Sequence, residues 1–204
     1  MILKFKKGFG ESLLNTVRQI AMTQIPAVRP IAFSVGTHSN VITIDDQIIE
    51  DMVTFISNVC SANYITQSSS KFFEINTTVS GTLDLLGLCK SSEISLISGN
   101  KEVLHSLADL PVRVVFRNGC GSAGVEENTL FLEENHVDVT NLTVINSRHS
   151  NIASFSVKKC RDENDLEVFD VSIETFDGVS ETKVFEQSTQ ILEDLVISLK
   201  KSGV

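Results

Sequence analysis

The fold that we expect for this chain is set by the stretch between residues 8 and 26, which reads GFGESLLNTVRQIAMTQIP. From Leu13 to Ala21 its apolar residues recur at spacings of three and four, which places them along one side of a helix. Pro26 ends that helix, because a proline has no backbone N–H to donate to the next turn. The stretch therefore predicts an amphipathic helix over Glu11–Gln24.

A second amphipathic helix is predicted near the end of the chain, where apolar residues recur with the same spacing between Val184 and Leu199. Ser180 suits its first turn, because a serine hydroxyl can accept a hydrogen bond from the helix backbone there. Lys200 and Lys201 suit its end, where the helix dipole favours positive charge. The chain therefore begins and ends with helices that each have one apolar side.

The segment between these helices is rich in β-branched and aromatic residues, which favour strands. A short helix is expected over residues 48–59, with Glu50 and Asp51 in its first turn. The expected strands cover residues 31–35, 72–79, 112–116, 130–132, 137–144, 152–157 and 168–175. This order predicts an α+β fold with two lobes. Residues 1–30 and 151–204 form one helix-plus-sheet lobe, and residues 31–150 form a β-rich insert lobe.

The charge and composition of the chain exclude several classes of protein. Lys and Arg number 17 against 26 Asp and Glu, and the formal net charge is -9, which argues against nucleic-acid binding by this chain itself. No apolar run is long enough to cross a bilayer, so no membrane association is expected. Because the first residues lack the composition of a signal or transit peptide, we expect a soluble intracellular protein.

Candidate catalytic and metal-binding residues are scattered. His38, His105, His136 and His149 each stand alone, and the four cysteines form no C-x-x-C pair, so neither a zinc site nor a catalytic histidine is indicated. Adjacent acidic residues, such as Glu133 and Glu134, point to different sides of a strand or helix and are interpreted as part of a solvated charged edge. The sequence therefore predicts no catalytic centre, no cofactor and no metal ion in this chain.

A glycine-rich loop is the one motif that suggests an enzyme. Residues 119–124 read GCGSAG, which matches G-x-G-x-x-G, and Asp138 lies near the offset of a ribose-binding acid. The residues that follow, 125–131, show no helical period, and their two carboxylates would repel a phosphate. An ordinary loop between strands is favoured, and a nucleotide-binding protein that uses Gly119–Gly124 stays an alternative.

The two terminal helices need an apolar surface to cover their apolar sides, and two helices alone bury little. Pairing with the same helices of a second copy would provide it, so we expect a dimer. The candidate interface residues are Leu13, Leu14, Val17, Ile20, Ala21, Val184, Ile191, Leu192, Leu195 and Leu199.

The stretch 8–26 resembles the opening of the bacterial and plastid-type RNA polymerase alpha subunit. That family has G-F-G-x-[ST]-L-x-N, then a leucine-rich helix with two arginines, then I/M-P, and the similarity continues as far as Glu50-Asp51-Met52. Weaker similarities follow in the family's order. They lie at residues 119–121 with 126–128, at 173–178 and at 190–192.

The resemblance implies a non-catalytic subunit of a DNA-directed RNA polymerase, with the two-lobed α+β fold of the N-terminal part of alpha. Two such subunits form the scaffold on which the large beta and beta-prime subunits assemble. Beta-prime meets the late strands of one subunit, and beta meets the first helix of the other. The residues that the resemblance assigns to contact with beta are Asn15, Arg18, Gln19, Met22 and Thr23.

The chain also departs from the family pattern. Gln19 stands where a second arginine is expected, so a bidentate pair with a carboxylate is lost there. Family members commonly continue into a small domain that binds promoter DNA, and because the sequence ends at Val204 we expect no such domain and no sequence-specific DNA binding. One half of a heterodimer, as in archaeal and eukaryotic polymerases, stays open, as do a bacterial-type cytoplasm and a plastid stroma.

Overall fold

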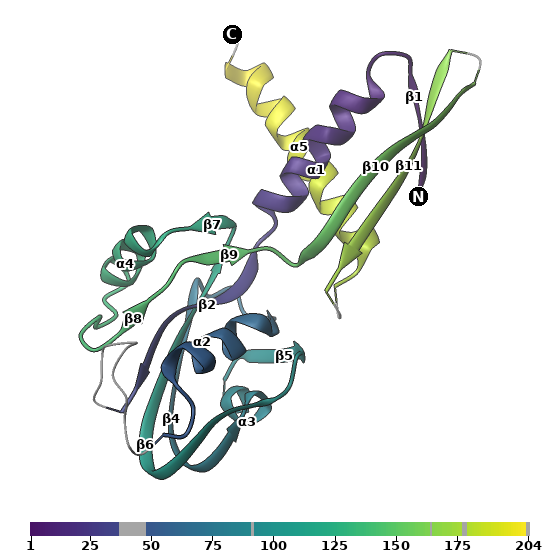
Figure 1. The fold of residues 1–204 in the computed structure, drawn as a ribbon. Helices are drawn as coiled ribbons and strands as arrows, with labels where there is room; N and C mark the ends of the chain where they lie inside the picture. The colour runs from purple at the N-terminus through teal and green to yellow at the C-terminus, as the bar shows by residue number, and fades with distance from the viewer. Residues whose placement is uncertain (37–47, 91, 164, 177–178, 203–204) are drawn as a thin grey trace. The chain divides into compact units, whose positions relative to one another are not determined.

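The computed structural model describes residues 1–36, 48–90, 92–163, 165–176 and 179–202 (Figure 1). The chain divides into two compact units. Unit 1 consists of Met1–Pro26 with Ser150–Val204, and unit 2 consists of Ala27–His149. The divisions fall after residues 26 and 149, whereas the sequence places them after residues 30 and 150. The chain contains both helices and strands, and every strand pair among the described residues is antiparallel, so the fold class is α+β, as predicted.

Unit 1 packs two long helices with one antiparallel sheet. Its elements are β1 (Ile2–Lys6), α1 (Gly10–Gln24), β10 (Ile152–Glu163), β11 (Leu166–Thr175) and α5 (Glu181–Ser202). The strand order is β1-β11-β10, so the first strand of the chain pairs with one of the last. Both terminal helices that the periodicity predicts are confirmed, and Ser180 caps α5 by accepting the Lys183 N–H at 3.4 Å.

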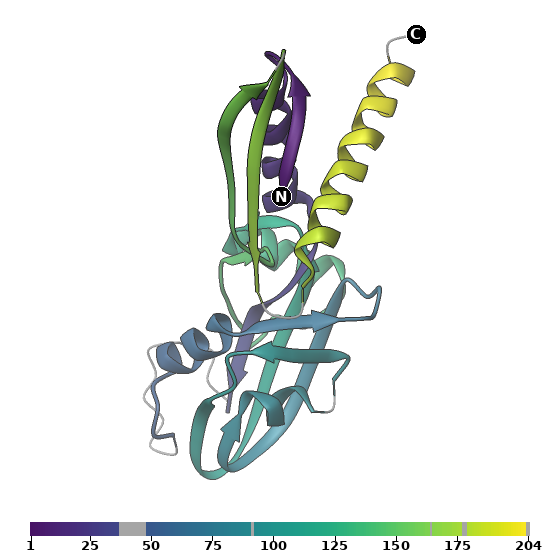
Figure 2. The same cartoon turned by 90° about the vertical axis from the view of Figure 1, so that its right-hand side faces the viewer.

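The apolar side of α1 is covered within unit 1 by the sheet. Leu14, Val17 and Ala21 belong to one buried cluster that also contains Phe155 and Phe169 from the strands. Figure 2 shows α1 behind the strands and the C-terminal half of α5 (yellow) standing away from them. The first helix therefore finds its apolar partner in its own protomer.

Unit 2 is built on a mixed arrangement of long and short antiparallel strands. Its elements are β2 (Ala27–Val35), α2 (Met52–Ser61), β3 (Asn63–Thr66), β4 (Phe72–Asp84), α3 (Leu85–Cys89), β5 (Ile94–Ser98), β6 (Glu102–Gly119), β7 (Gly121–Ala123), α4 (Val125–Glu134), β8 (Thr143–Val144) and β9 (Ser147–His149). The main sheet has the order β4-β6-β2-β3-β5, with β8 also on β2, and β7 pairs with β9.

Both faces of the main sheet are covered. Val114 on β6 belongs to the cluster under α2 and α3, which contains the edge-to-face ring pair Phe33–Phe55. The adjacent Val115 points to the opposite face and joins the cluster that contains Leu132 of α4. Because successive residues of a strand alternate between faces, one strand serves both cores.

Two of the predicted strands are wrong. Residues 130–132 lie in α4, and of residues 137–144 only Thr143 and Val144 form a strand. The core-facing side of α4 carries Asn128 one turn before Leu132, and both are fully buried. A polar residue at that position hides the helical period from a search for apolar spacing.

The predicted helix at residues 48–59 begins later than expected. Its first residue is Met52, and Asp51 precedes it as an N-cap whose carboxylate accepts the Thr54 N–H at 2.6 Å. Glu50 and Asp51 are therefore outside the helix rather than in its first turn. Among the described residues, no helix is both long and apolar enough to cross a membrane.

Candidate functional site

A groove runs along α1 in unit 1, between the helix and β10. It has a volume of about 430 Å³, and Phe155 of β10 lines it beside α1. The α1 residues that line it are Asn15, Thr16, Arg18, Gln19, Met22 and Thr23. The five residues that the resemblance assigns to contact with beta therefore lie together on one surface.

The groove combines an apolar floor with an exposed cation. Met22 and Phe155 pack on or belong to the buried cluster of unit 1, whereas Arg18 is exposed. Within the described part of the chain no ion pair joins the Arg18 guanidinium to a carboxylate. A guanidinium presents five donors in a planar fork, so this groove suits a partner segment with one apolar and one acidic side chain.

The predicted interface residues fall into two groups. Leu14, Val17, Ala21 and Val184 are core residues of unit 1, and Ile20 is also buried. These side chains are buried within the protomer, so they cannot contact a second copy. The sequence predicts that a second copy covers them, but they are covered inside unit 1 instead. Leu13, Ile191, Leu192, Leu195 and Leu199 are partly or largely exposed.

The C-terminal half of α5 exposes an apolar stripe. Leu195 is 50% exposed, Leu199 is 72% exposed, and Val196 lies beside them at 42%. With Leu192, which packs at the margin of the core, these residues have the spacing i, i+3, i+4, i+7. The same side of the helix is buried earlier, at Val184, so the stripe continues the packed side of α5 beyond the part that the rest of unit 1 covers.

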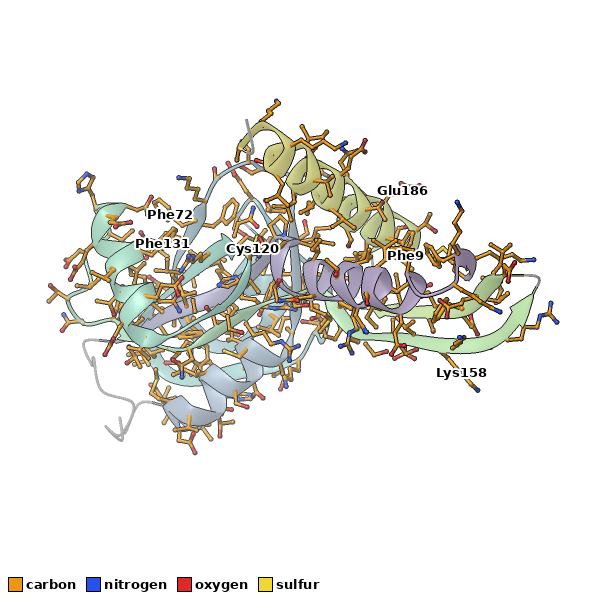
Figure 3. All side chains as sticks on the ribbon, turned by 90° about the horizontal axis from the view of Figure 1, so that it is seen from above. Phe9, Phe72, Cys120, Phe131, Lys158 and Glu186 are labelled. Carbon is orange, nitrogen blue, oxygen red and sulfur yellow. The ribbon has the colours of Figure 1, made fainter. Side chains whose placement is uncertain are left out.

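Val196 is not among the interface residues expected from the sequence, although it lies four residues after Leu192 and three before Leu199. A second exposed apolar pair, Phe9 and Leu13, lies at the start of α1, where Figure 3 labels Phe9. These side chains are one helical turn apart. The exposed apolar surface of unit 1 therefore includes parts of both helices.

The glycine-rich loop at residues 119–124 leads directly into α4, and the expectation that no helix follows it is wrong. The Val125 N–H at the start of α4 already donates to Asn146 Oδ1 at 2.9 Å, and the first turn carries Glu126 and Glu127. The neighbouring strands β7 and β9 pair antiparallel, whereas the dinucleotide fingerprint needs a parallel strand–loop–helix unit. The loop geometry does not favour a phosphate.

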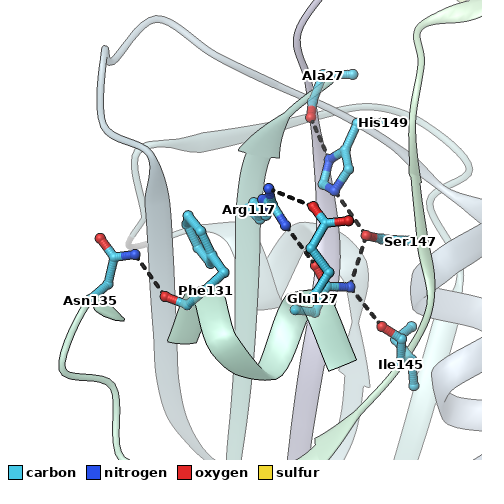
Figure 4. A network of polar contacts seen from close by, with 9 residues as sticks. Ala27, Arg117, Glu127, Phe131, Asn135, Ile145, Ser147 and His149 are labelled. Atoms are coloured by element: carbon cyan, nitrogen blue, oxygen red, sulfur yellow. Dashed lines mark hydrogen bonds and ion pairs between the residues drawn. The ribbon is translucent and has the colours of Figure 1, made fainter. Parts of the chain in front are cut away.

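A buried polar network joins the first and last residues of unit 2 (Figure 4). His149 Nδ1 lies 2.9 Å from the Ala27 carbonyl oxygen, so Nδ1 carries the proton and Nε2 accepts from the Ser147 hydroxyl at 2.8 Å. Asn128 donates from Nδ2 to Ser147 Oγ at 3.0 Å, and its Oδ1 accepts from Arg117 at 3.1 Å. The network fixes the tautomer of His149.

The outer end of this network is held by charge. The Arg117 guanidinium lies 3.1 Å from the Glu127 carboxylate and 4.4 Å from the centre of the Phe131 ring. Burial lowers the pKa of His149, and the positive charges of Arg117 and Arg29 lower it further. The histidine is therefore neutral in the folded protein near pH 7.

The Ser147–His149 pair has the geometry of a nucleophile and its base, with a backbone carbonyl where a carboxylate would orient the ring. Both side chains are buried, however, and His149 has no exposed surface. A substrate cannot reach the hydroxyl, so the pair joins β9 to β2 and serves stability rather than catalysis.

A second histidine pair lies on the surface of unit 2. Glu50 accepts the backbone N–H of His105 at 2.6 Å and also pairs with its ring, whose other nitrogen lies 3.3 Å from Glu102. The hydrogen bond from the His105 ring to the Glu50 carboxylate raises the pKa of His105. Across the described ranges, no group of three or more His, Cys, Asp and Glu side chains could hold a metal ion.

Comparison with known proteins adds no relative to this picture. No protein-family model matches the chain, and no curated protein matches it. A function for this chain is therefore inferred from the residues of the stretch 8–26 and from the surfaces that unit 1 presents.

Proposed function

We propose that this chain is an alpha-type subunit of a multisubunit DNA-directed RNA polymerase, which dimerises and supports assembly of the beta and beta-prime subunits. One observation carries the proposal. The stretch that resembles the family's opening folds as α1, and the residues that the family uses to meet beta line one groove beside this helix. On this proposal nucleotidyl transfer takes place on the large subunits, and the chain itself is not catalytic.

The α5 stripe supports the dimer. Its C-terminal half presents Leu195, Val196 and Leu199 in continuation of the side that packs inside unit 1. The apolar side of α5 extends beyond the core of its own protomer. The same helix of a second copy can cover it, because the two stripes are identical and self-complementary. A standard interface buries about 800 Å² on each partner, so the Phe9–Leu13 surface of α1 would have to contribute as well.

The groove on α1 supports contact with a large subunit. The exposed Arg18 guanidinium, which has no ion-pair partner among the residues that the structure describes, lies beside the apolar side chains of Met22 and Phe155. Gln19 offers hydrogen bonds where the family carries a second arginine, so one ion pair rather than two is expected here. A partner segment with an acidic residue next to an apolar residue fits this surface.

The decisive experiment is purification of the tagged chain from its native cells at moderate salt. The proposal expects the two large polymerase subunits in the eluate, with transcription activity that depends on them, and two copies of this chain per complex. A pair with a second alpha-like chain in equal amount would support the heterodimer instead. Purification of the chain alone as a monomer would contradict the proposal.

A further inference from the structure

Among the described residues, the sheet of unit 2 ends at β4, and this edge has few of the usual defences against strand addition. Its regular part, Phe72–Val79, carries one charge, Glu74, and contains no Lys, Arg or Pro. By contrast, the edge strand β1 carries Lys4 and Lys6 among its five residues. Edge strands are normally protected by lysines, prolines, bulges or short length. Here a bulge appears only after Val79.

Two hydrogen bonds fix which backbone groups of β4 point outward. The Asn118 N–H donates to the Lys71 carbonyl at 2.8 Å, next to the pair Phe72–Arg117. In an antiparallel pair, hydrogen-bonded positions alternate with positions that are not hydrogen-bonded. The odd-numbered residues of this stretch therefore bond to β6, and the backbone groups of residues 72, 74, 76 and 78 point away from it.

An independent bond on the other side of β6 agrees with this assignment. The Gly36 N–H donates to the Pro111 carbonyl at 2.8 Å, so Pro111 directs its backbone toward β2. Pro111 lies opposite Thr78 in the β4–β6 register. Thr78 consequently has no backbone partner on β6, as the first bond requires.

We propose that the β4 edge pairs, antiparallel and in register, with the β4 edge of a second copy of this chain, about a two-fold axis at Ile75. This register places Phe72 opposite Thr78 of the second copy and Glu74 opposite its Asn76. The four outward residues of each copy then form about eight backbone hydrogen bonds, two for each hydrogen-bonded pair. The pairing extends the sheet across both copies.

The side chains favour this occupant and this register. The two-fold at Ile75 sets aromatic residues opposite β-branched ones, Phe72 with Thr78 and Phe73 with Thr77, and such cross-strand pairs are stabilising. Glu74 meets the carboxamide of Asn76, its hydrogen-bond complement. In the present structure Asn76 Nδ2 already donates to Glu74 Oε1 at 2.7 Å, so this contact would repeat across the axis.

Charge also separates this register from its neighbours. A two-fold at residue 74 would set two carboxylates directly opposite each other, which is unfavourable. A two-fold at residue 76 would bring Phe72 opposite Ser80, beyond the regular part of the strand. At Ile75 the carboxylates are diagonal, and each is paired with Arg113 at 2.8 Å in its own copy.

This interface lies in unit 2 and does not depend on the α5 stripe of unit 1. The test therefore uses the full chain with Leu195→Asp, which removes the proposed α5 contact. Amide hydrogen exchange is followed by NMR at protein concentrations from about 10 μM to about 1 mM, the range in which weak pairing is populated. The amides of Glu74, Asn76 and Thr78 are expected to gain protection as concentration rises, while those of Phe73 and Ile75 are protected throughout.

Two substitutions isolate the backbone contribution. Asn76→Pro removes one outward N–H and leaves the β4–β6 bonds in place, because a proline is tolerated where its missing N–H faces solvent. It is expected to weaken self-association at least about tenfold. Asn76→Ala keeps the N–H and loses only the side-chain contact with Glu74, so it is expected to weaken self-association less than Asn76→Pro does. Thermal unfolding of both variants checks that unit 2 is folded.

A peptide that spans residues 71–79 serves as a probe of the edge. It is expected to compete with self-association and to slow exchange of the same outward amides. Exchange that is independent of concentration would overturn the proposal, even if the peptide binds, because the edge would then accept a strand but not that of a second copy. Open-ended aggregates in place of a discrete pair would overturn the two-fold register.

Discussion

Gly10 lies directly against the ring of Phe169: a Cβ on Gly10 would meet the Phe169 Cε2 atom at 2.3 Å, well inside contact distance. This relationship explains the second glycine of the motif at residues 8–10 in physical terms. The first turn of α1 approaches β11 so closely that no side chain fits between them. Gly8, at φ +87°, has a backbone conformation that L residues rarely adopt, so the two glycines serve different ends.

The substitution Gly10→Ala is therefore expected to destabilise unit 1 by about 1–3 kcal/mol, the usual cost of overpacking a core. The new methyl group must displace the Phe169 ring, which belongs to the buried cluster of unit 1. Urea denaturation followed by circular dichroism measures the change. The gain in helix propensity from Gly to Ala, about 1 kcal/mol, works against the loss.

The control for this prediction is the double variant with Phe169→Leu. A smaller side chain at residue 169 makes room for the methyl group, so Gly10→Ala is expected to cost less in that background than in the natural one. If Gly10→Ala destabilised both backgrounds equally, contact with the Phe169 ring would not be the reason that residue 10 is a glycine.

The sequence was sufficient for α1 and α5 because their apolar residues keep a helical spacing and their ends carry Pro26 and Ser180. It was insufficient for the length of β6, which runs through Pro111. A proline normally argues against a strand in the middle of a sheet. Pro111 is tolerated because it lies opposite Gly36, just beyond the end of β2, so its missing N–H costs no bond within that strand pair.

The candidate site was predictable in part for a similar reason. The groove residues of α1 are neighbours on one helix, so spacing and resemblance together place them on one surface. Phe155 completes the groove from a strand far along the chain, and no local pattern connects it with Arg18. The exposure of the α5 stripe depends on how far the core of unit 1 extends along that helix, which spacing alone does not reveal.

The buried network around His149 predicts how stability depends on pH. The pKa of His149 in the folded protein lies below the ordinary value of 6.5. Between the folded and the ordinary pKa, the unfolded chain therefore binds more protons than the folded chain. Stability is then complete above about pH 6.5 and falls as the pH drops below it, by at most about 1.4 kcal/mol per pH unit for one proton. Urea midpoints between pH 7.5 and 5 measure this slope.

His105 contributes with the opposite sign, because its pKa is raised by Glu50. Its stabilisation is complete below pH 6.5 and is lost as the pH rises through the folded pKa, so its slope lies above pH 6.5 and that of His149 lies below it. His105→Gln should therefore remove a loss of stability above pH 6.5, and His149→Gln should flatten the loss of stability below it. The same slope in both variants and in the natural chain would contradict the assignment.

The α5 stripe predicts that Leu195→Asp abolishes the proposed dimer without unfolding the protomer. Leu195 is half exposed in the protomer, so a carboxylate there stays hydrated until a second copy approaches, when it would be buried without a partner. Sedimentation equilibrium is expected to shift from two copies to one, a weakening of at least about a hundredfold.

Ile197→Asp is the matched control for the α5 stripe. Ile197 is also apolar and 41% exposed, but it projects from the other side of the helix, about 150° from the stripe. The same change of chemistry at residue 197 is expected to leave the dimer intact. If the two variants behaved alike, the helix would contribute a general solubility effect rather than a defined interface.

The substitution Arg18→Ala is expected to weaken contact with the beta subunit and to leave the dimer intact. The Arg18 guanidinium is exposed on α1 and takes no part in the buried cluster, so its removal should leave the free energy of unfolding within about 0.5 kcal/mol of the natural chain. A charged partner group left unpaired in a contact costs about 1–3 kcal/mol, so recovery of beta in a pull-down should fall about tenfold or more.

Arg18→Lys keeps the charge without the planar fork, so its recovery of beta should fall between that of Arg18→Ala and that of the natural chain. Thr16→Ala is the control, because Thr16 also lines the groove but its hydroxyl already donates to the Ser12 carbonyl. This variant should recover beta as the natural chain does. Equal recovery by Arg18→Ala would remove the groove from the proposed interface and leave the α5 stripe as its support.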